Sequence, residues 1–276
     1  MTAPFDPLAE QLRQNPRPVR LSACMLAKDA SATIAASLQS LRFCDQIIVI
    51  VDAATRDNTE AIAHGLASHV EVRKWEGFSS AWRYVLGKGE GEWLFMIAAD
   101  EIVTPVLAQS ILDAIVHDLS CDASAKQDGF LMRRNTCFLG RYLTHGDWGR
   151  DYVLRIIRRS KFAFNDAVIH ESLKNPGRTR ILDGILQHEG ERTIEEHLAR
   201  QNRYTSLSAE QMHAQGRRIS LVGMIVKSKF SFVRSYFLRL GFLDGWPGLV
   251  QAVYSSVYVF TRYAKLRELN RRSKAT

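Results

Sequence analysis

The first half of the chain alternates short apolar runs with segments whose apolar residues recur every three or four positions. Runs of strand length occupy residues 19–26, 46–51, 70–74 and 93–97. Helical spacing occupies residues 31–41, 59–68, 80–86 and 105–117, and Ser31 and Pro105 suit the first turns of two of these helices. Strands and helices that take turns in this way predict parallel βαβ units. We therefore expect an α/β fold, a mostly parallel sheet with helices on both faces.

The alternation ends after residue 128. Two more strand-like runs, at 129–134 and 153–157, flank a loop rich in glycine and aromatic residues, FLGRYLTHGDWGRDY. From residue 193 onward the pattern is mostly helical. This change predicts a boundary near residue 190, between an α/β domain at 1–190 and a helical C-terminal region at 191–276.

Composition and charge refine this division. The chain has 276 residues, 46% hydrophobic and 24% charged, which excludes a disordered chain, a collagen and a disulfide scaffold. Its net charge of +8 is uneven, because from Arg217 onward twelve Lys or Arg face only Asp244 and Glu268. A near-neutral body with a basic tail predicts that the tail meets an anionic partner, either nucleic acid or an anionic membrane surface.

Cysteine spacing and apolar length predict the compartment. The four cysteines show neither zinc-site pairing nor the density of a secreted scaffold, which favours a reduced, cytoplasmic setting. The first twenty residues contain no export signal, and the apolar stretch at 246–260 is shorter than the roughly 20 residues that span a bilayer. We expect a cytoplasmic protein whose membrane contact, if it has one, is peripheral.

The basic tail has an apolar face. Apolar residues separated by three or four positions trace one side of a helix: Val222, Val226, Phe230, Val233, Phe237 and Leu240. Lys227, Ser231 and Arg234 fall on another side. A basic amphipathic helix suits the interface of an anionic bilayer, although the stripe would also suit packing against the body. No nucleic-acid-binding motif is present, so we expect no nucleic-acid partner.

Acidic residues follow three of the predicted strands. Asp29 follows the first, Asp52 ends the second and Asp100 follows the fourth. Ligands of open α/β sheets bind beyond the carboxyl ends of the strands. The glycine-rich motifs that cradle dinucleotides or phosphates are absent from the sequence. Carboxylates without such a cradle suit a nucleoside and, through a divalent metal, a diphosphate. For Asp29 and Asp57, a helix cap or turn is the alternative interpretation.

Several segments occur in an order that is typical of one enzyme family. They are LAKDAS after the first strand, IVDAATRDNT at 50–59, WEGF at 75–78, WLFMIAADE at 93–101, LGRYLTHGDW at 139–148, LRIIRR at 154–159, His170-Glu171 and GFLDG at 241–245. Together they resemble glycosyltransferase family 2, which has the GT-A fold, and more closely its bacterial lipopolysaccharide-core and capsule β-glucosyltransferase branch. The resemblance extends from about Leu21 to Leu269.

The resemblance implies an inverting transfer of a hexose such as glucose. The donor would be a nucleoside-diphosphate sugar, and the acceptor a lipid-linked lipopolysaccharide-core or other cell-envelope glycan, at the inner face of the cytoplasmic membrane. Asp52 and Asp57 would contact the uridine. Asp100 matches the second acid of the D-x-D motif and, with His188, would bind Mg²⁺ or Mn²⁺. The first acid of that motif is Ala98 here. A catalytically impaired sugar-nucleotide or glycan-binding homologue is therefore the alternative.

The resemblance also implies roles for further residues. The remaining donor contacts would be Lys28, Asp29, Arg83, Arg155 and Arg158. Glu171 would be the general base, with Asp151 and Asp166 as rivals, and Trp148 and His170 would bind the acceptor. Other interpretations stay open: Arg155 and Arg158 as solvated strand charges, Trp148 as a core residue and His188 as a loop histidine.

Overall fold

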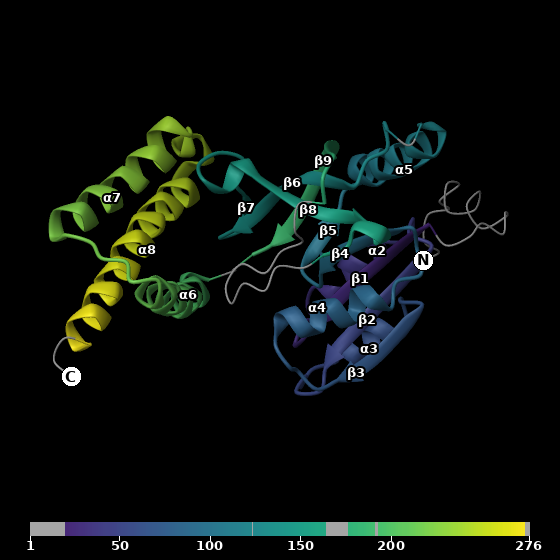
Figure 1. The fold of residues 1–276 in the computed structure, drawn as a ribbon, viewed down its shortest axis with the longest axis horizontal. Helices are drawn as coiled ribbons and strands as arrows, with labels where there is room; N and C mark the ends of the chain where they lie inside the picture. Colours follow the sequence, from purple (N-terminus) through teal and green to yellow (C-terminus); the bar gives the residue numbers. More distant parts are fainter. Residues whose placement is uncertain (1–19, 123, 164–175, 191–192, 274–276) are drawn as a thin grey trace. The chain divides into compact units, whose positions relative to one another are not determined.

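The computed structural model describes residues 20–122, 124–163, 176–190 and 193–273 (Figure 1). The chain forms two compact units. The first contains the residues up to Arg134 and those from Tyr152 to His188. The second contains Asn135–Asp151 and the residues from Glu189 onward. The glycine-rich and aromatic loop, assigned to the first domain from sequence, thus groups with the helical unit.

One sheet organises the α/β part of the chain. Its strand order is β3-β2-β1-β4-β8-β6-β9-β5, with β7 paired to β6. The strands are β1 (Leu21–Ala27), β2 (Gln46–Asp52), β3 (His69–Arg73), β4 (Trp93–Ala98), β5 (Glu101–Val103), β6 (Gly129–Phe138), β7 (Arg141–Tyr142), β8 (Asp151–Arg158) and β9 (Thr179–Glu189). Strands β3, β2, β1 and β4 run parallel, whereas β8 is antiparallel to β4. The predicted α/β class is confirmed.

Helices cover both faces of the parallel strands. They are α2 (Ile34–Ser40), α3 (Thr59–His64), α4 (Phe78–Gly87) and α5 (Pro105–Ser120). Strand β2 explains how both faces become buried, because its successive side chains point to opposite sides. Ile47 and Val49 join the core cluster that contains residues of α2 and α5, while Ile48 and Ile50 join the cluster that contains residues of α4.

Two expectations about the α/β unit were wrong. Ser31 does not cap α2, which begins at Ile34 after Thr33; the Ser31 N–H instead donates to Asp57 Oδ2 at 2.9 Å. Strand β9 was not expected at all. By contrast, Pro105 begins α5 as predicted, and the Thr104 hydroxyl accepts a hydrogen bond from the Leu107 N–H.

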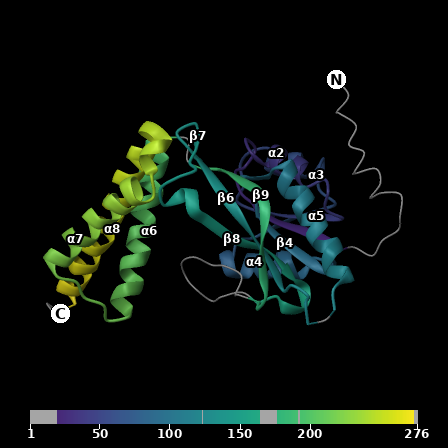
Figure 2. The same cartoon turned by 90° about the horizontal axis from the view of Figure 1, so that it is seen from above.

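The second unit is helical after its first strands. It contains the short 3₁₀ helix η1 (Trp148–Arg150), α6 (Ile194–Ala214), α7 (Leu221–Val233), the π-helical turn η3 (Arg234–Leu238), η4 (Gly241–Asp244) and α8 (Gly245–Arg272). A capping box formed by Thr193 and Glu196 starts α6. Helices α7 and α8 lie side by side as a hairpin in both views (Figures 1 and 2). Among the described residues, no helix is long and apolar enough to cross a membrane.

Candidate active site

The carboxyl ends of β2, β1 and β4 lie next to one another. The parallel registers pair Ala27 of β1 with Val51 of β2, and Leu26 of β1 with Ala98 of β4. The residues that follow these pairs are therefore neighbours at one edge of the sheet. They include Lys28 after β1, Asp52 at the end of β2 and Asp100 after β4, three of the residues expected at a donor site.

Asp52 is a buried carboxylate that faces a lysine at this edge. It is 4% exposed, and its Oδ2 lies 2.8 Å from Lys28 Nζ, whose side chain is half exposed. The Ala54 N–H donates to Asp52 Oδ1 at 2.9 Å. The hydrogen bond from Lys28, followed by that from Ala54, lowers the pKa of Asp52 despite its burial. The pair thus places a permanent negative charge beside an accessible ammonium group.

Asp29 and Asp57 connect the two loops next to the Lys28–Asp52 pair by hydrogen bonds. Asp29 has a left-handed backbone, with φ of 45°, and its Oδ1 accepts a hydrogen bond from the Arg56 N–H at 2.8 Å. Asp57 accepts hydrogen bonds from the Thr59 hydroxyl and from the N–H groups of Ser31 and Thr59, which hold its pKa well below the usual range. Both carboxylates join the loop after β1 to the loop after β2, so they shape the edge from within the protein.

The turn after β4 is held by Glu101, which is fully buried. Its Oε2 accepts a hydrogen bond from the Ala98 N–H at 3.0 Å, and its Oε1 pairs with Arg155 and, at 3.2 Å, with Arg134. Burial opposes ionisation of Glu101, but the two guanidinium charges outweigh it and lower the pKa to about 2. Glu101 therefore orders the turn, and Arg155 is its partner.

Asp100 and His188 form a second, partly exposed polar pair at this edge. Strand β9 pairs His188 with Glu101 of β5, which brings its imidazole to the Asp100 carboxylate, with Nε2 and Oδ2 3.4 Å apart. The His188 side chain is 13% exposed and that of Asp100 is 36% exposed. An imidazole and a carboxylate that face solvent together are ligands that suit Mn²⁺ or, with waters, Mg²⁺. The described residues contain no group of three or more His, Cys, Asp or Glu side chains that could hold a metal ion.

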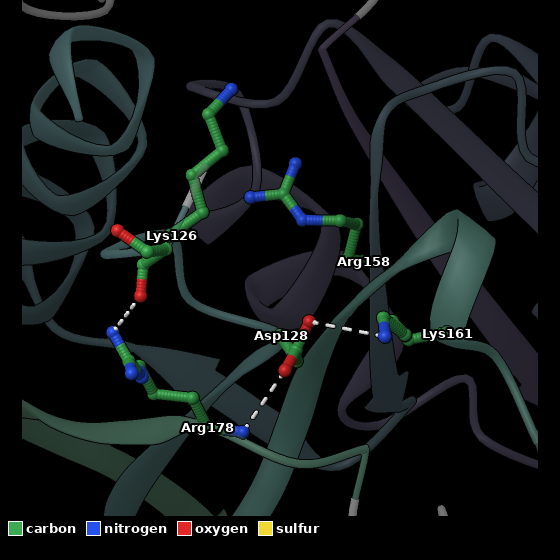
Figure 3. A pocket seen from close by; sticks show the side chains of 6 residues that line it. Lys126, Asp128, Arg158, Lys161 and Arg178 are labelled. Atoms are coloured by element: carbon green, nitrogen blue, oxygen red, sulfur yellow. Dashed lines mark hydrogen bonds and ion pairs between the residues drawn. The ribbon is translucent and has the colours of Figure 1, made fainter. Parts of the chain in front are cut away.

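Arg158 lies at the other end of β4. The antiparallel register pairs it with Trp93, the first residue of that strand. Its guanidinium bonds to Glu92, to Asp118 and to the carbonyl of Gln127. It also lines an open pocket of about 490 Å³ with Ser124, Lys126, Asp128, Lys161 and Arg178 (Figure 3). Arg158 therefore lies away from the carboxyl ends of β2, β1 and β4. Glu92 and Asp118 neutralise its charge.

The other expected residues are distributed more widely. Arg83 lies on the exposed side of α4. Asp151 begins β8, and Trp148 is half-buried in η1, where its ring contacts those of Phe138 and His197. Asp166, His170 and Glu171 lie outside the described residues.

Sequence reasoning missed a buried acid–histidine pair in the second unit. Asp244, of the segment GFLDG, is 1% exposed and accepts hydrogen bonds from the N–H groups of Thr144 and His145 at 3.1 and 2.8 Å. Its other oxygen lies 3.0 Å from the Thr144 hydroxyl and 3.1 Å from His145 Nδ1. The signal was present, because LGRYLTHGDW and GFLDG both belong to the ordered segments, but no spacing rule joins residues a hundred positions apart.

Comparison with known proteins identifies the class. The family model for glycosyl transferase family 2 matches residues 22–160, which include Lys28, Asp52 and Asp100. The chain belongs to this family and is a glycosyltransferase.

Two curated relatives extend the similarity beyond the matched region. The lipopolysaccharide core biosynthesis glycosyltransferase LpsC of Rhizobium meliloti (strain 1021) is 26% identical over 255 residues, which cover 89% of this chain and 91% of that protein. The uncharacterized glycosyltransferase RP128 of Rickettsia prowazekii (strain Madrid E) is 23% identical and covers 92% of this chain and 89% of its own length. The similarity therefore includes both units.

One solved structure supports the fold. The mannosyltransferase PcManGT from Pyrobaculum calidifontis, in complex with GDP-Man and Mn²⁺, superposes with a TM-score of 0.52 at 13% identity, covering 94% of this chain and 92% of that one. The α/β unit thus has the GT-A fold.

Proposed function

We propose that this glycosyltransferase moves a hexose such as glucose, with inversion, from a nucleoside-diphosphate sugar to a lipopolysaccharide-core or other lipid-linked cell-envelope glycan. One observation supports the donor side most strongly. Asp52 ends β2, Lys28 follows β1 and Asp100 follows β4 at one edge of the sheet; Lys28 pairs with Asp52, and His188 of β9 pairs with Asp100. The acceptor side follows from similarity to LpsC, whose name describes lipopolysaccharide core biosynthesis.

The two pairs suit different parts of the donor. Asp52, ionised and 4% exposed, would accept hydrogen bonds from the nucleoside, and the half-exposed Lys28 ammonium would face the adjoining phosphates. Asp29 and Asp57 would act indirectly, by fixing the loops that surround the nucleoside.

Asp100 and His188 would hold Mg²⁺ or Mn²⁺ in this proposal. A bound divalent ion would supply the positive charge that stabilises the departing diphosphate. The protein's own contribution is to fix the turn: Glu101 binds the Ala98 N–H, and the Ser37 hydroxyl donates to the Ala98 carbonyl at 3.2 Å. Asp100 is therefore presented on an ordered backbone.

The general base and the acceptor contacts complete the proposal. Glu171 is our assignment for the base, with Asp166 and Asp151 as rivals, and Trp148 and His170 would bind the acceptor glycan. Transfer at a lipid-linked glycan places the protein peripherally at the inner face of the cytoplasmic membrane.

Ala98 motivates a second candidate function. Without the first acid of the D-x-D motif, the chain would act as a sugar-nucleotide or glycan-binding homologue with little turnover. Glu101 does not replace the missing carboxylate, because it is buried and bonded to Arg134 and Arg155.

Donor turnover separates the two candidates. Release of nucleoside diphosphate from UDP-glucose, UDP-N-acetylglucosamine and GDP-mannose is measured with Mg²⁺, Mn²⁺ or EDTA, with and without a deacylated inner-core oligosaccharide. We expect turnover of one donor that depends on the metal and falls at least a hundredfold in Asp100→Ala. Asp113→Ala, which removes an exposed acid on α5, is the matched control and leaves turnover unchanged. Binding of a donor without turnover would favour the second candidate, and turnover that survives in Asp100→Ala would overturn the role of Asp100.

A further inference from the structure

Exposed apolar side chains concentrate in one part of the second unit. Of the 25 large apolar side chains that are exposed in the described part of the chain, 16 lie between Leu221 and Phe260. They belong to α7, η3, η4 and α8 as far as Phe260, and Leu240 lies between η3 and η4. Scattered exposed apolar residues are ordinary, but 16 of them between Leu221 and Phe260 indicate an interaction surface.

Helix α7 has polar residues inside and apolar residues outside. The residues it buries are Met224, Ser228 and Ser231. Ser228 Oγ bonds to the carbonyl and hydroxyl of Ser256 on α8, each at 2.9 Å. The opposite side of α7 exposes Leu221, Val222, Ile225, Val226, Phe230 and Val233. The apolar stripe predicted from the sequence is therefore found on α7, on the side that α7 exposes.

Helix α8 repeats this arrangement. Its first half buries Gly248, Gln251 and Ala252, and Gln251 Oε1 accepts a hydrogen bond from the Ser235 hydroxyl at 3.0 Å. A side chain at Gly248 would clash with the backbone of Gly241, which shows how closely the chain approaches here. The residues that this half exposes are Trp246, Leu249, Val253, Val257 and Phe260. Small residues and hydrogen-bonded hydroxyl groups at a helix contact, with apolar residues outside, are typical of helices that pack within lipid.

The turn of the hairpin is the most apolar part. Between α7 and α8 the exposed residues are Phe237, Leu238, Leu240 and Phe242, followed by Leu243. Leu240 has a left-handed backbone with φ of 58°, a conformation that is uncommon for leucine. The fold therefore keeps these side chains exposed at a cost in backbone strain, which indicates that their position is used.

The charges of the hairpin define its partner. Arg217, Arg218, Lys227 and Lys229 are exposed on or just before α7, and Arg271 and Arg272 end α8. In residues 217–273 the only acids are Asp244, which is buried, and Glu268, which pairs with Arg272. Exposed apolar side chains together with exposed cations are complementary to a leaflet that contains anionic phospholipid.

We propose that the α7–α8 hairpin inserts its apolar face into the interfacial layer of an anionic membrane, lying in the plane of the leaflet without crossing it. The inference deepens the peripheral membrane location proposed above and rests on that part of the proposed function. It does not depend on which donor or acceptor the enzyme uses.

A second copy of the chain is a less suitable occupant. Twofold pairing of this face would bring together two segments that each have twelve Lys or Arg and two acids from Arg217 onward, so like charges would oppose one another. Lysine is also depleted at protein–protein interfaces, whereas Lys229 lies among the exposed apolar residues of α7.

Vesicle flotation with the full chain tests the proposal. The vesicles are phosphatidylcholine alone or a 7:3 mixture of phosphatidylcholine and phosphatidylglycerol. We expect binding to the mixture that falls at least tenfold in Phe230→Glu and in Phe242→Glu. Val106→Glu, at a side chain that is 63% exposed on α5 of the first unit, is the matched control and binds like the wild type. Lys227→Gln with Lys229→Gln weakens binding to the mixture, and added salt reduces that difference.

Two further measurements complete the test. Brominated lipids should quench Trp246 fluorescence, measured as the difference between the wild type and Trp246→Phe, which would show that the hairpin enters the acyl region. Sedimentation velocity reports self-association, and donor turnover without vesicles shows whether each variant is folded and active. Three results would each overturn the proposal. The wild type does not bind anionic vesicles, the Phe230→Glu and Phe242→Glu variants bind them like the wild type, or the protein is a dimer that Phe230→Glu dissociates. If binding fails while donor turnover persists, the membrane surface is wrong and the transferase assignment stands.

Discussion

The two units place polar and apolar side chains in opposite ways. In the α/β unit, β2 buries a continuous apolar run, and the fully buried carboxylate of Glu101 is matched by Arg134 and Arg155. In the hairpin, Ser228 and Ser231 are buried while Val222 and Phe230 are exposed. The first arrangement is stabilised by removing apolar surface from water. The second relies on close backbone approach and hydrogen bonds, which also hold where the surroundings are apolar.

This difference matches the two roles that we propose, donor binding by the α/β unit and membrane binding by the hairpin. The carboxylate edge needs charges fixed to within fractions of an ångström, and a rigid sheet supplies that. To bind a membrane, the hairpin needs an apolar outer surface. The contact between its two helices only has to hold them together. The comparison therefore predicts that substitutions in the two units have different consequences, which the following experiments measure from the largest expected effect to the smallest.

Glu101→Gln should have the largest effect on stability. The change leaves the guanidinium charges of Arg134 and Arg155 without their buried counter-charge, which costs about 3–5 kcal/mol in comparable pairs. Urea unfolding measures the free energy. Glu268→Gln, which breaks the exposed pair with Arg272 in the hairpin, should cost less than about 1 kcal/mol. Equal losses of unfolding free energy in the two variants would show that the ion pairs of Glu101 contribute no more than an exposed one.

The same carboxylate predicts a sensitivity to acid. Its pKa is about 2 in the folded protein, below the value of roughly 4.3 for an unfolded glutamate. A lowered pKa contributes stability that is complete above the unfolded value and is lost as the pH falls through the folded value. The difference in unfolding free energy between the wild type and Glu101→Gln, measured at steps from pH 6 to pH 2, should therefore begin to shrink below about pH 4 and be smallest at pH 2. A constant difference across that range would contradict the assignment.

A pair of isoleucines compares the two interiors directly. Ile48 in β2 is 1% exposed, so Ile48→Ala should cost about 2–5 kcal/mol of unfolding free energy. Ile225 in α7 is 45% exposed, and Ile225→Ala should change the free energy in solution by less than about 0.5 kcal/mol. Thermal unfolding in buffer measures both. A large cost at Ile225 would mean that the face of α7 is packed against protein.

Asp244→Asn should have a smaller and local effect. An amide in place of the carboxylate turns its NH₂ group towards some of the three groups of Thr144 and His145 that donate to Asp244, two backbone N–H groups and the Thr144 hydroxyl, which costs about 1–3 kcal/mol. Hydrogen exchange should accelerate at the Thr144 and His145 amides, with the amides of β2 unchanged. Uniform acceleration throughout the chain would instead indicate global destabilisation.

The sequence alone predicted the parallel half of the sheet and its acidic edge, because a charged residue follows each apolar run in β1, β2 and β4 within two positions. It missed β9 for a physical reason. Leu182 and Leu186 are its buried residues, four positions apart, and Gly184 between them has φ of 94° and lies against Leu107. Gly184 leaves the middle position of this face without a side chain, so the sequence does not show the apolar period of two that marks a strand.

Two further features depend on contacts that a sequence pattern does not contain. Arg158 follows an apolar run, as the edge acids do, but β8 runs antiparallel to β4 and places it at the opposite end. The outward orientation of the α7 stripe follows from which side α8 covers. A helical period identifies an apolar side of a helix, and only the neighbouring helix determines whether that side is buried.

Calorimetric titration of UDP tests the central claim, that the edge formed by β1, β2 and β4 binds the donor nucleotide through Asp100. We predict that the wild type binds UDP more tightly with Mn²⁺ than with EDTA, and that Asp100→Asn loses at least tenfold in affinity with Mn²⁺ while matching the wild type in EDTA. Equal affinities of both proteins in Mn²⁺ and in EDTA would contradict the account.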